Sequence, residues 1–499
     1  FGDSMYSKNS VILWAAIYSS YFIFILLFQK LLLKFYWKKQ VVEKLITYII
    51  VCLLVFPISF ATYTSIIGYQ KSSIVQSKVT GNFDSDLSQL SIQNKYDIPL
   101  NIIAYIGEST SRLHWSLYGY PRPTTKSLDK YEGKGELIKF ENIYSSHSHT
   151  SPSLLEALSI DADFVDNLHN IQPIENKRRV SLVDVLIKGG IKTHLYSNQG
   201  SSGTWNMASS IIFKNAILKK FSSTKILGNA ADIDKNKPYD HVFLDDFLLY
   251  LKDTPKVQKN FVVFHSYAGH GPYERNIPIN YREIIDDYYE GITDSGIFGE
   301  AKNIATLENL ESYDSVMRYI SDNLTKVLNV VDTINKPTVL VYFSDHGESV
   351  FSGKGHDSSR YTWEMTAVPF LLYFNESAKM ILKDKYEEYK ILARDESADS
   401  LINLYSLIFD LFGVEVNNNG DLLNLCSFGT GNCFPKHYMI RELLDGKISY
   451  VGLGNEVTDT RYINNSDRAT VHINLAKKLL TDKKDTKICS HRNNSIASI

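Results

Sequence analysis

Two polar clusters in this sequence each follow an apolar run; the first contains a glutamate, and the second contains an aspartate and a histidine. Glu108 comes soon after the apolar residues 101–106, within Gly-Glu-Ser, and Asp345 and His346 follow residues 338–343, within Ser-Asp-His-Gly-Glu-Ser. Ligands of open α/β sheets bind beyond the carboxyl ends of the strands, so these side chains are expected to lie close together. Carboxylate and imidazole groups suit Zn²⁺ or Mn²⁺, and the sequence therefore predicts a metal site.

A hydroxyl-rich segment could supply a nucleophile. Residues 146–153 read Ser-His-Ser-His-Thr-Ser-Pro-Ser and lead into an apolar helical run, so Thr150 and Ser151 are expected near a helix N-terminus. The N-terminus of a helix favours anions, and a hydroxyl there is well placed to attack a phosphate. Thr and Ser are also common helix caps, and from this segment alone a cap is the simpler interpretation.

Further histidines lie near the ends of predicted strands. His265 and His270 belong to a segment that contains Gly-His-Gly-Pro-Tyr, and His356 lies in Gly-Lys-Gly-His after the Asp-His pair. A single histidine is more often structural than functional. Three that converge on strand ends favour the binding of a metal or a phosphoryl oxygen.

The composition limits the class of protein. The chain has 499 residues, 44% of them hydrophobic, and a formal net charge of −2. Its length suits a membrane segment plus one large domain, and its charge gives no basic footprint for nucleic acid. Cys426 and Cys433 flank a short loop, where a disulfide and two free thiols are equally consistent with the spacing.

Two long apolar stretches precede the rest of the chain. Residues 11–28 and 45–69 carry no charge, and we predict transmembrane helices over about 11–33 and 45–69. The loop between them carries five lysines against one glutamate. The positive-inside rule therefore places that loop in the cytoplasm and the chain after residue 70 on the far side. A pair of buried core helices is the alternative, but lysine-flanked runs of this length are hard to place in a soluble core.

The composition changes after this membrane region, residues 1–70. Residues 71–97 are polar with little periodicity and are predicted to form a juxtamembrane linker. Over residues 98–437, apolar runs alternate with helical patterns, which predicts an α/β domain with a mainly parallel sheet flanked by helices. Residues 438–499 are expected to form an extension with a hairpin over 448–462, a helix over 469–480 and a disordered tail. Strands are expected at 101–106, 192–196, 261–265, 338–343 and 368–374, and helices at 181–188, 242–251, 313–328 and 400–411.

These motifs together resemble the bacterial phosphoethanolamine transferases, which form part of the sulfatase-like branch of the alkaline phosphatase superfamily. The resemblance rests on GESTSRLHWSLYGYPRPTT, HTSPS, GHGPY, and SDHGES followed by GKGH. It extends from about residue 101 to residue 374 and includes the membrane anchor. Members commonly have five transmembrane helices, so the two here would be the last two. The resemblance implies an alkaline phosphatase-like fold, and an enzyme of the bacterial inner membrane with its catalytic domain in the periplasm.

The resemblance also implies a metal centre and a nucleophile. Glu108, Thr150, Asp345 and His346 would hold a catalytic Zn²⁺, with Mn²⁺ as the other candidate. Thr150 would also attack the donor lipid, phosphatidylethanolamine, and form a covalent phosphoethanolamine-threonine intermediate. The implied acceptor is lipopolysaccharide or another cell-envelope glycan, and both lipids lie in the bilayer beside the enzyme.

Four further residues take their implied roles from the same resemblance. His270 and His356 would bind the transferred phosphate or move a proton. Asn198 and Gln199 fall where the family places polar residues that bind the donor. The lipid A-modifying members carry cysteine pairs around the nucleophile, and this sequence has none there. That departure favours an acceptor in the core sugars.

Other activities are less consistent with the motifs. Sulfatases make formylglycine from Cys or Ser in a Cys/Ser-x-Pro-x-Arg motif, whereas this chain has Thr150 at the first position and Leu154 at the last. Phosphoglycerol transferases share the Glu, Thr and Asp-His set and remain the enzymatic alternative. A metal-free pseudoenzyme that serves as a membrane scaffold is the alternative of another class, and the presence of all four ligand residues argues against it.

Overall fold

The computed structural model divides the chain into two compact units, Phe1–Ser77 and Lys78–Ile499. It describes Lys30 and residues 87–452 apart from several gaps, so every element below belongs to the second unit. The gaps are 121, 162–177, 202–206, 224–238, 254–257, 283–303, 351–352, 354, 358–362, 395–398, 419–420, 423–426, 431–436 and 442–447. Within the described ranges, no helix is both long and apolar enough to cross a membrane. Apart from Lys30, the two predicted membrane helices lie outside those ranges, as do Cys426, Cys433 and the helix predicted at 469–480.

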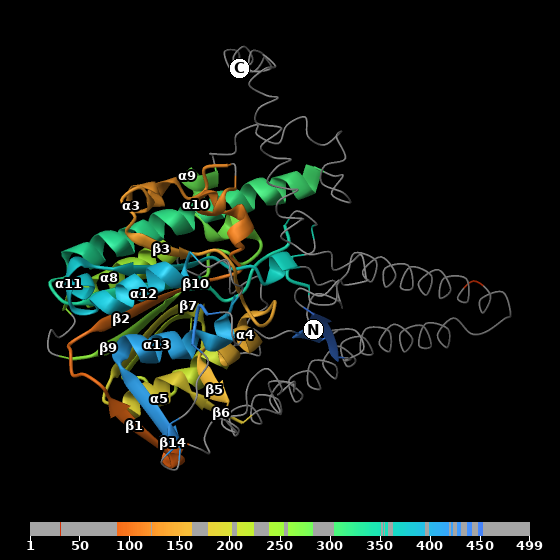
Figure 1. Cartoon of the computed structure of the whole chain (residues 1–499). Helices are drawn as coiled ribbons and strands as arrows, with labels where there is room; N and C mark the ends of the chain where they lie inside the picture. Colours follow the sequence, from red (N-terminus) through yellow and green to blue (C-terminus); the bar gives the residue numbers. More distant parts are fainter. Residues whose placement is uncertain are drawn as a thin grey trace, which may run out of the picture. The chain divides into compact units, whose positions relative to one another are not determined.

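A seven-stranded mixed sheet forms the centre of the domain (Figure 1), with the order β3-β11-β10-β2-β9-β7-β8. In that order the strands are Leu137–Phe140, Phe370–Phe374, Thr338–Ser344, Asn101–Gly107, Asn260–His265, Lys192–Gly200 and Leu218–Ser223. The five strands from β10 to β8 are parallel, whereas β11 is antiparallel to both of its neighbours. The prediction of a largely parallel sheet is therefore confirmed, and β11 makes the sheet mixed.

The central strands are buried on both faces, which explains their sequences. All seven residues of β2 and all seven of β10 are buried, so both strands read as continuous apolar runs without polar alternation. Gly107 at the end of β2 pairs with Ser344 at the end of β10, and Ile106 pairs with His265 at the end of β9. The segments that follow these three strands therefore leave the sheet at the same edge.

Helices cover the two faces of this sheet. Figure 1 shows α8 (Asp240–Asp253) and α10 (Ile304–Thr333) on one side, and α5 (Leu182–Lys188) and α13 (Leu404–Phe412) on the other. The first pair packs on side chains such as Tyr105 in one buried cluster. The four helices overlap the ranges predicted from the sequence, and each differs from its prediction by a few residues at one or both ends, most of all at the start of α10.

Two regions differ from the sequence-based expectation. The segment expected to be a linker contains β1 (Leu90–Asn94), which pairs antiparallel with β13 (Val414–Asn418). Its composition hides this strand because only Leu90 is buried. β16 (Ile448–Gly452) lies in the range of the expected C-terminal hairpin, but it pairs with the preceding β15 (His437–Arg441), and the rest of the expected hairpin lies outside the described residues.

Candidate active site

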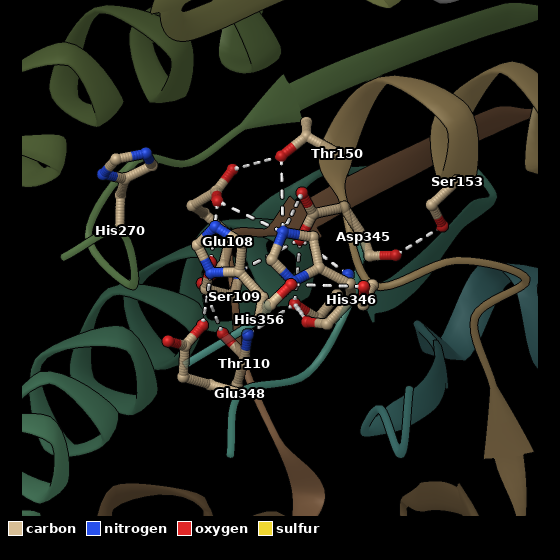
Figure 2. Close-up of polar contacts among 12 residues, drawn as sticks. Glu108, Ser109, Thr110, Thr150, Ser153, His270, Asp345, His346, Glu348 and His356 are labelled. Carbon is tan, nitrogen blue, oxygen red and sulfur yellow. Dashed lines mark hydrogen bonds and ion pairs between the residues drawn. The ribbon is translucent and has the colours of Figure 1, made fainter. Parts of the chain in front are cut away.

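Four side chains converge at the edge of the sheet where β2 and β10 end (Figure 2). Glu108 follows β2, and Asp345 and His346 follow β10; all three are buried. Thr150 is the first residue of α4 (Thr150–Ala157) and is half-buried. Ser153, one turn further along α4, donates to the carbonyl oxygen of Asp345 at 2.5 Å and ties the helix to the end of β10.

The spacing of the four side chains fits one metal ion. The Thr150 hydroxyl lies 3.5 Å from Glu108 Oε2 and 3.4 Å from His346 Nε2. The same His346 nitrogen lies 3.7 Å from Glu108 Oε1 and 3.5 Å from Asp345 Oδ2. Ligands about 2.0–2.1 Å from a tetrahedral Zn²⁺ are about 3.3 Å apart, so these separations are close to those of a coordinated set.

The Asp345 carboxylate has one oxygen held by the protein and one that points into the cluster. Its Oδ1 accepts from the backbone N–H of Ser109 at 3.0 Å and of His346 at 2.7 Å. Its buried Oδ2 has no hydrogen bond within the described residues, and leaving such an atom without a partner is costly unless a cation binds there. Burial alone would raise the pKa of Asp345, but the neighbouring His346 and His265 rings and the Ser109 amide hold that pKa below its ordinary value.

His346 has the tautomer that a metal ligand requires. Its Nδ1 donates to the carbonyl oxygen of Gly347 at 2.8 Å, which leaves Nε2 with a lone pair directed at the cluster. Burial outweighs the nearby Asp345 carboxylate and lowers the pKa of His346. A neutral imidazole whose second nitrogen is fixed by a carbonyl is the usual form of a histidine ligand.

Both oxygens of the Glu108 carboxylate also have partners in the protein. The Ser109 hydroxyl donates to Oε1 at 2.9 Å, and the Gln199 amide donates to Oε2 at 2.7 Å. The neighbouring amide of Asn198 points elsewhere and donates to Asp240 at 2.6 Å. The structure therefore places Gln199 beside the predicted ligands and Asn198 away from them.

The loop after β2 has a strained residue that α10 holds in place. Ser109 has a positive φ of 50°, which is uncommon for a residue other than glycine. The hydroxyl of Tyr313 accepts from the N–H of Ser111 at 2.8 Å and donates to the carbonyl oxygen of Ser109 at 2.6 Å. All of these groups are buried.

Replacing Tyr313 by phenylalanine is expected to lower the free energy of unfolding by about 2–4 kcal/mol, because two buried backbone groups lose their partner. Urea denaturation of the variant and the wild type measures the difference. Tyr105→Phe is a matched control, since its buried hydroxyl has no hydrogen bond in the described part of the chain. Equal losses in the two variants would contradict the role assigned to the Tyr313 hydroxyl.

Two predicted histidines lie at different distances from this cluster. The Nδ1 of His356 donates to Glu348 Oε2 at 2.9 Å, and its ring centre lies 5.0 Å from that of His346. The Nδ1 of His270 donates to the carbonyl oxygen of Gly271 at 2.7 Å, and the His270 ring centre lies 6.4 Å from that of His356. Figure 2 shows His356 within the cluster and His270 beside it. The structure therefore brings His356 to the predicted ligands, while His270 stays at the rim.

The structure adds functional candidates that the sequence did not single out. Glu348 accepts from both His356 and the hydroxyl of Tyr273, the latter at 2.9 Å. Burial alone would raise the pKa of Glu348, but the His356 ring and its hydrogen bond hold that pKa below the ordinary value. Glu348 lies in the same Ser-Asp-His-Gly-Glu-Ser motif as the predicted ligands, so its position in that motif was the available signal.

Two other histidines border the site. His149 occupies the N-cap position of α4, and its ring packs edge to face on that of His356, with the ring centres 5.3 Å apart. The Nε2 of His265 lies 4.0 Å from Glu108 Oε2. Among the residues that the structure describes, two groups of side chains have ligand atoms close enough together for a metal: Glu108 with His265 and Asp345, and His346 with Glu348 and His356.

The helix-cap interpretation of Thr150 does not hold. The cap position of α4 is His149, and Thr150 is already helical. Its hydroxyl is directed at Glu108 and His346, so it faces the predicted ligands.

A comparison with known families places this arrangement in context. The sequence matches the sulfatase family over residues 100–414, the part of the chain that carries the central sheet and all four converging side chains. The chain belongs to the sulfatase family. Membership describes shared ancestry and fold. At the motif position where sulfatases carry the Cys or Ser that becomes formylglycine, this chain has Thr150.

Several curated members of the sulfatase family are similar to this chain. Phosphoethanolamine transferase EptC of Escherichia coli (strain K12) is 28% identical over 286 residues, which cover 56% of this chain and 45% of that protein. Phosphoethanolamine transferase EptA of Helicobacter pylori is 28% identical over 287 residues, 56% of this chain and 48% of that protein. The matched region thus spans about half the length of these relatives.

Solved structures confirm the fold. The periplasmic domain of EptC from Escherichia coli, in complex with Zn, aligns with a TM-score of 0.56 at 24% identity, covering 72% of this chain and 94% of that one. The integral membrane protein lipooligosaccharide phosphoethanolamine transferase A from Neisseria meningitidis aligns with a TM-score of 0.51 at 16% identity, covering 78% and 73%. The fold of this chain is therefore alkaline phosphatase-like, as predicted.

Proposed function

We propose that the chain is a metal-dependent transferase that moves phosphoethanolamine from phosphatidylethanolamine to lipopolysaccharide or another cell-envelope glycan. The observation that carries this proposal is the threonine hydroxyl at the start of α4, which lies within 3.5 Å of Glu108 and His346, two buried candidate metal ligands. The relatives that match the chain are named phosphoethanolamine transferases.

Glu108, Thr150, Asp345 and His346 would hold Zn²⁺, or Mn²⁺. The bound ion would lower the pKa of the Thr150 hydroxyl and offset the negative charge on the phosphate. In the first step Thr150 Oγ1 forms a bond to phosphorus, and the bond from phosphorus to the glycerol oxygen breaks. Diacylglycerol leaves with a proton on that oxygen, and phosphoethanolamine stays on the threonine.

In the second step an oxygen of the acceptor attacks the same phosphorus from the side that diacylglycerol left. The bond from phosphorus to Thr150 breaks and the threonine regains its proton. His356 would move these protons: its Nδ1 donates to Glu348 Oε2 at 2.9 Å and its ring centre lies 5.0 Å from that of His346, and a histidine oriented in this way can act as acid and base. His270, at the rim, would bind a phosphoryl oxygen. Two steps through a covalent intermediate predict ping-pong kinetics.

A donor-binding role for Asn198 and Gln199 has less support from the contacts. Both side chains are buried, and both amides already donate to carboxylates of the protein. A headgroup would have to displace Asp240 or Glu108 to reach them.

The same proposal includes a location for the protein. Helices over about 11–33 and 45–69 would anchor it in the bacterial inner membrane, with a linker between residue 71 and β1. The catalytic domain, which includes β1, would lie in the periplasm, and the C-terminal extension would begin with β15 at His437. The lysine-rich loop between the two apolar stretches supports this orientation, and a structural relative is an integral membrane protein. An anchor would keep the site beside two substrates that are themselves lipids.

Intact-mass measurement of the purified chain after incubation with Zn²⁺ and phosphatidylethanolamine tests the proposal. We expect a gain of one phosphoethanolamine unit that Thr150→Ala abolishes. Ser151→Ala, which removes the adjacent hydroxyl, is the matched control and should keep the adduct. A phosphoglycerol adduct from phosphatidylglycerol, with no adduct from phosphatidylethanolamine, would show that the donor is phosphatidylglycerol. No adduct from either lipid in metal-loaded protein would contradict a covalent transferase.

A further inference from the structure

Gln199, near the end of β7, has an amide with two partners inside the protein. Its side chain is 3% exposed, and its Nε2 donates to Glu108 Oε2 and to the carbonyl oxygen of Ser266, each at 2.7 Å. An amide nitrogen carries two hydrogens, so both donors are used. The amide bridges the end of β9 to the predicted metal ligand that follows β2.

The partner on the β9 side is itself held rigidly. Asp240, the first residue of α8, accepts from the Ser266 hydroxyl at 2.7 Å, and from the backbone N–H groups of Tyr267 and Ala268 at 3.0 Å each. Asp240 is 1% exposed, and buried charge-assisted hydrogen bonds of this kind are strong. The carbonyl oxygen of Ser266 therefore gives the Gln199 amide a fixed anchor.

The amide determines which way the Glu108 carboxylate faces. Ser109 holds Oε1 and Gln199 holds Oε2, so the plane of the carboxylate is set by one donor on each oxygen. Oε2 also lies 3.5 Å from the Thr150 hydroxyl, and Oε1 lies 3.7 Å from His346 Nε2. The Nε2 of His265 lies 4.0 Å from Oε2, and within the described ranges Glu108, His265 and Asp345 also have ligand atoms close enough together for a metal.

Two donors from the protein restrain rotation of the Glu108 carboxylate, so its oxygens stay near the Thr150 hydroxyl and His346 Nε2. Hydrogen bonds that orient a metal-binding side chain in this way support metal affinity, and their loss weakens it.

We propose that Gln199 is a positioning residue of the metal centre, which holds Glu108 toward Thr150 and His346. This inference rests on the metal centre of the proposed function and not on the identity of the donor lipid. In this inference Gln199 orients a metal ligand and does not contact the donor lipid.

Equilibrium Zn²⁺ binding by the purified chain, measured by competition with a chelator and without lipid, tests the inference. Gln199→Met keeps the length of the side chain and removes both donors. We expect its Zn²⁺ affinity to fall by about 10–100-fold, as for other groups that orient metal ligands. The transfer rate kcat should fall with it, whereas the KM for the donor should stay within about twofold. Wild-type Zn²⁺ affinity together with a raised donor KM would overturn the inference in favour of donor binding.

Asn215→Leu is the matched control, because Asn215 also donates an amide hydrogen bond to a carboxylate, that of Asp184, away from the site. It should leave Zn²⁺ affinity unchanged. Gln199→Asn is the second variant, for use if the methionine variant does not fold. Its shorter side chain cannot reach both Glu108 and the carbonyl oxygen of Ser266, so we expect a similar loss of Zn²⁺ affinity. Wild-type Zn²⁺ affinity in this variant would overturn the inference. The Zn²⁺ measurement contains no lipid. A loss of Zn²⁺ affinity in the Gln199 variants would therefore support the positioning role even if the proposed donor lipid proved wrong.

Discussion

Replacing Thr150 by alanine is expected to reduce transfer by about four to six orders of magnitude, the scale found when the nucleophile of a covalent enzyme is removed. The reason is that, in the proposed mechanism, the hydroxyl is both the attacking atom and one of the four candidate metal ligands. Initial rates with phosphatidylethanolamine as donor measure the effect. The fold should persist, because the side chain is half-buried and its two hydrogen bonds are long, at 3.4 and 3.5 Å.

Thr150→Ser separates the chemistry of the residue from its shape. Serine keeps the hydroxyl and loses only the methyl group, so we expect it to retain activity within about a hundredfold of the wild type, a loss of less than about 3 kcal/mol in transition-state stabilisation. If alanine and serine were equally active, or if alanine kept a substantial rate, Thr150 could not be the nucleophile.

Removing the metal is expected to have the second large effect. A cation that binds only the folded chain stabilises it by about 2.7 kcal/mol when present at 100 times its dissociation constant. Thermal unfolding should therefore shift upward with Zn²⁺ and return to the metal-free value with chelator. Transfer should disappear and reappear in the same way.

Asp345→Asn should abolish that thermal shift. The asparagine side chain keeps the shape of Asp345 and can still accept from the backbone through one oxygen. It places an uncharged amide nitrogen where Oδ2 points into the cluster. Asp246→Asn, which changes an exposed aspartate paired with Lys220, is the matched control and should keep the full shift. A Zn²⁺ shift that survived in Asp345→Asn would show that the cation binds elsewhere.

The central sheet was predictable because its strands are buried on both faces. Continuous apolar runs such as those of β2 and β10 are typical of parallel strands covered by helices on both sides, and helical patterns alternate with them in this chain. The direction of β11 was not predictable, since an apolar run carries no information about which way a strand points. β1 was missed because a strand with one buried side chain has a polar composition.

The candidate site was predictable to a similar extent. Residues that directly follow strands, such as Glu108 and Asp345, could be brought together from the rule that parallel strands end at one edge. The contacts of Gln199 and the pairing of Glu348 with His356 could not, because they depend on side-chain directions between distant segments. The sequence also could not decide whether Thr150 caps the helix or faces the candidate ligands, because the same residue types serve as caps and as nucleophiles.

The pairing of β2 with β10 also constrains when the proposed metal centre can form during synthesis. Ser109 and Asp345, which hydrogen-bond at the edge of the sheet, are separated by 236 residues in the chain. At about 5–20 residues per second, the ribosome completes the second half of the centre roughly 10–50 s after the first. Closing so long a loop is entropically unfavourable until the intervening strands are present. Until Asp345 and His346 have been synthesised, a nascent chain therefore lacks half of the proposed ligand set.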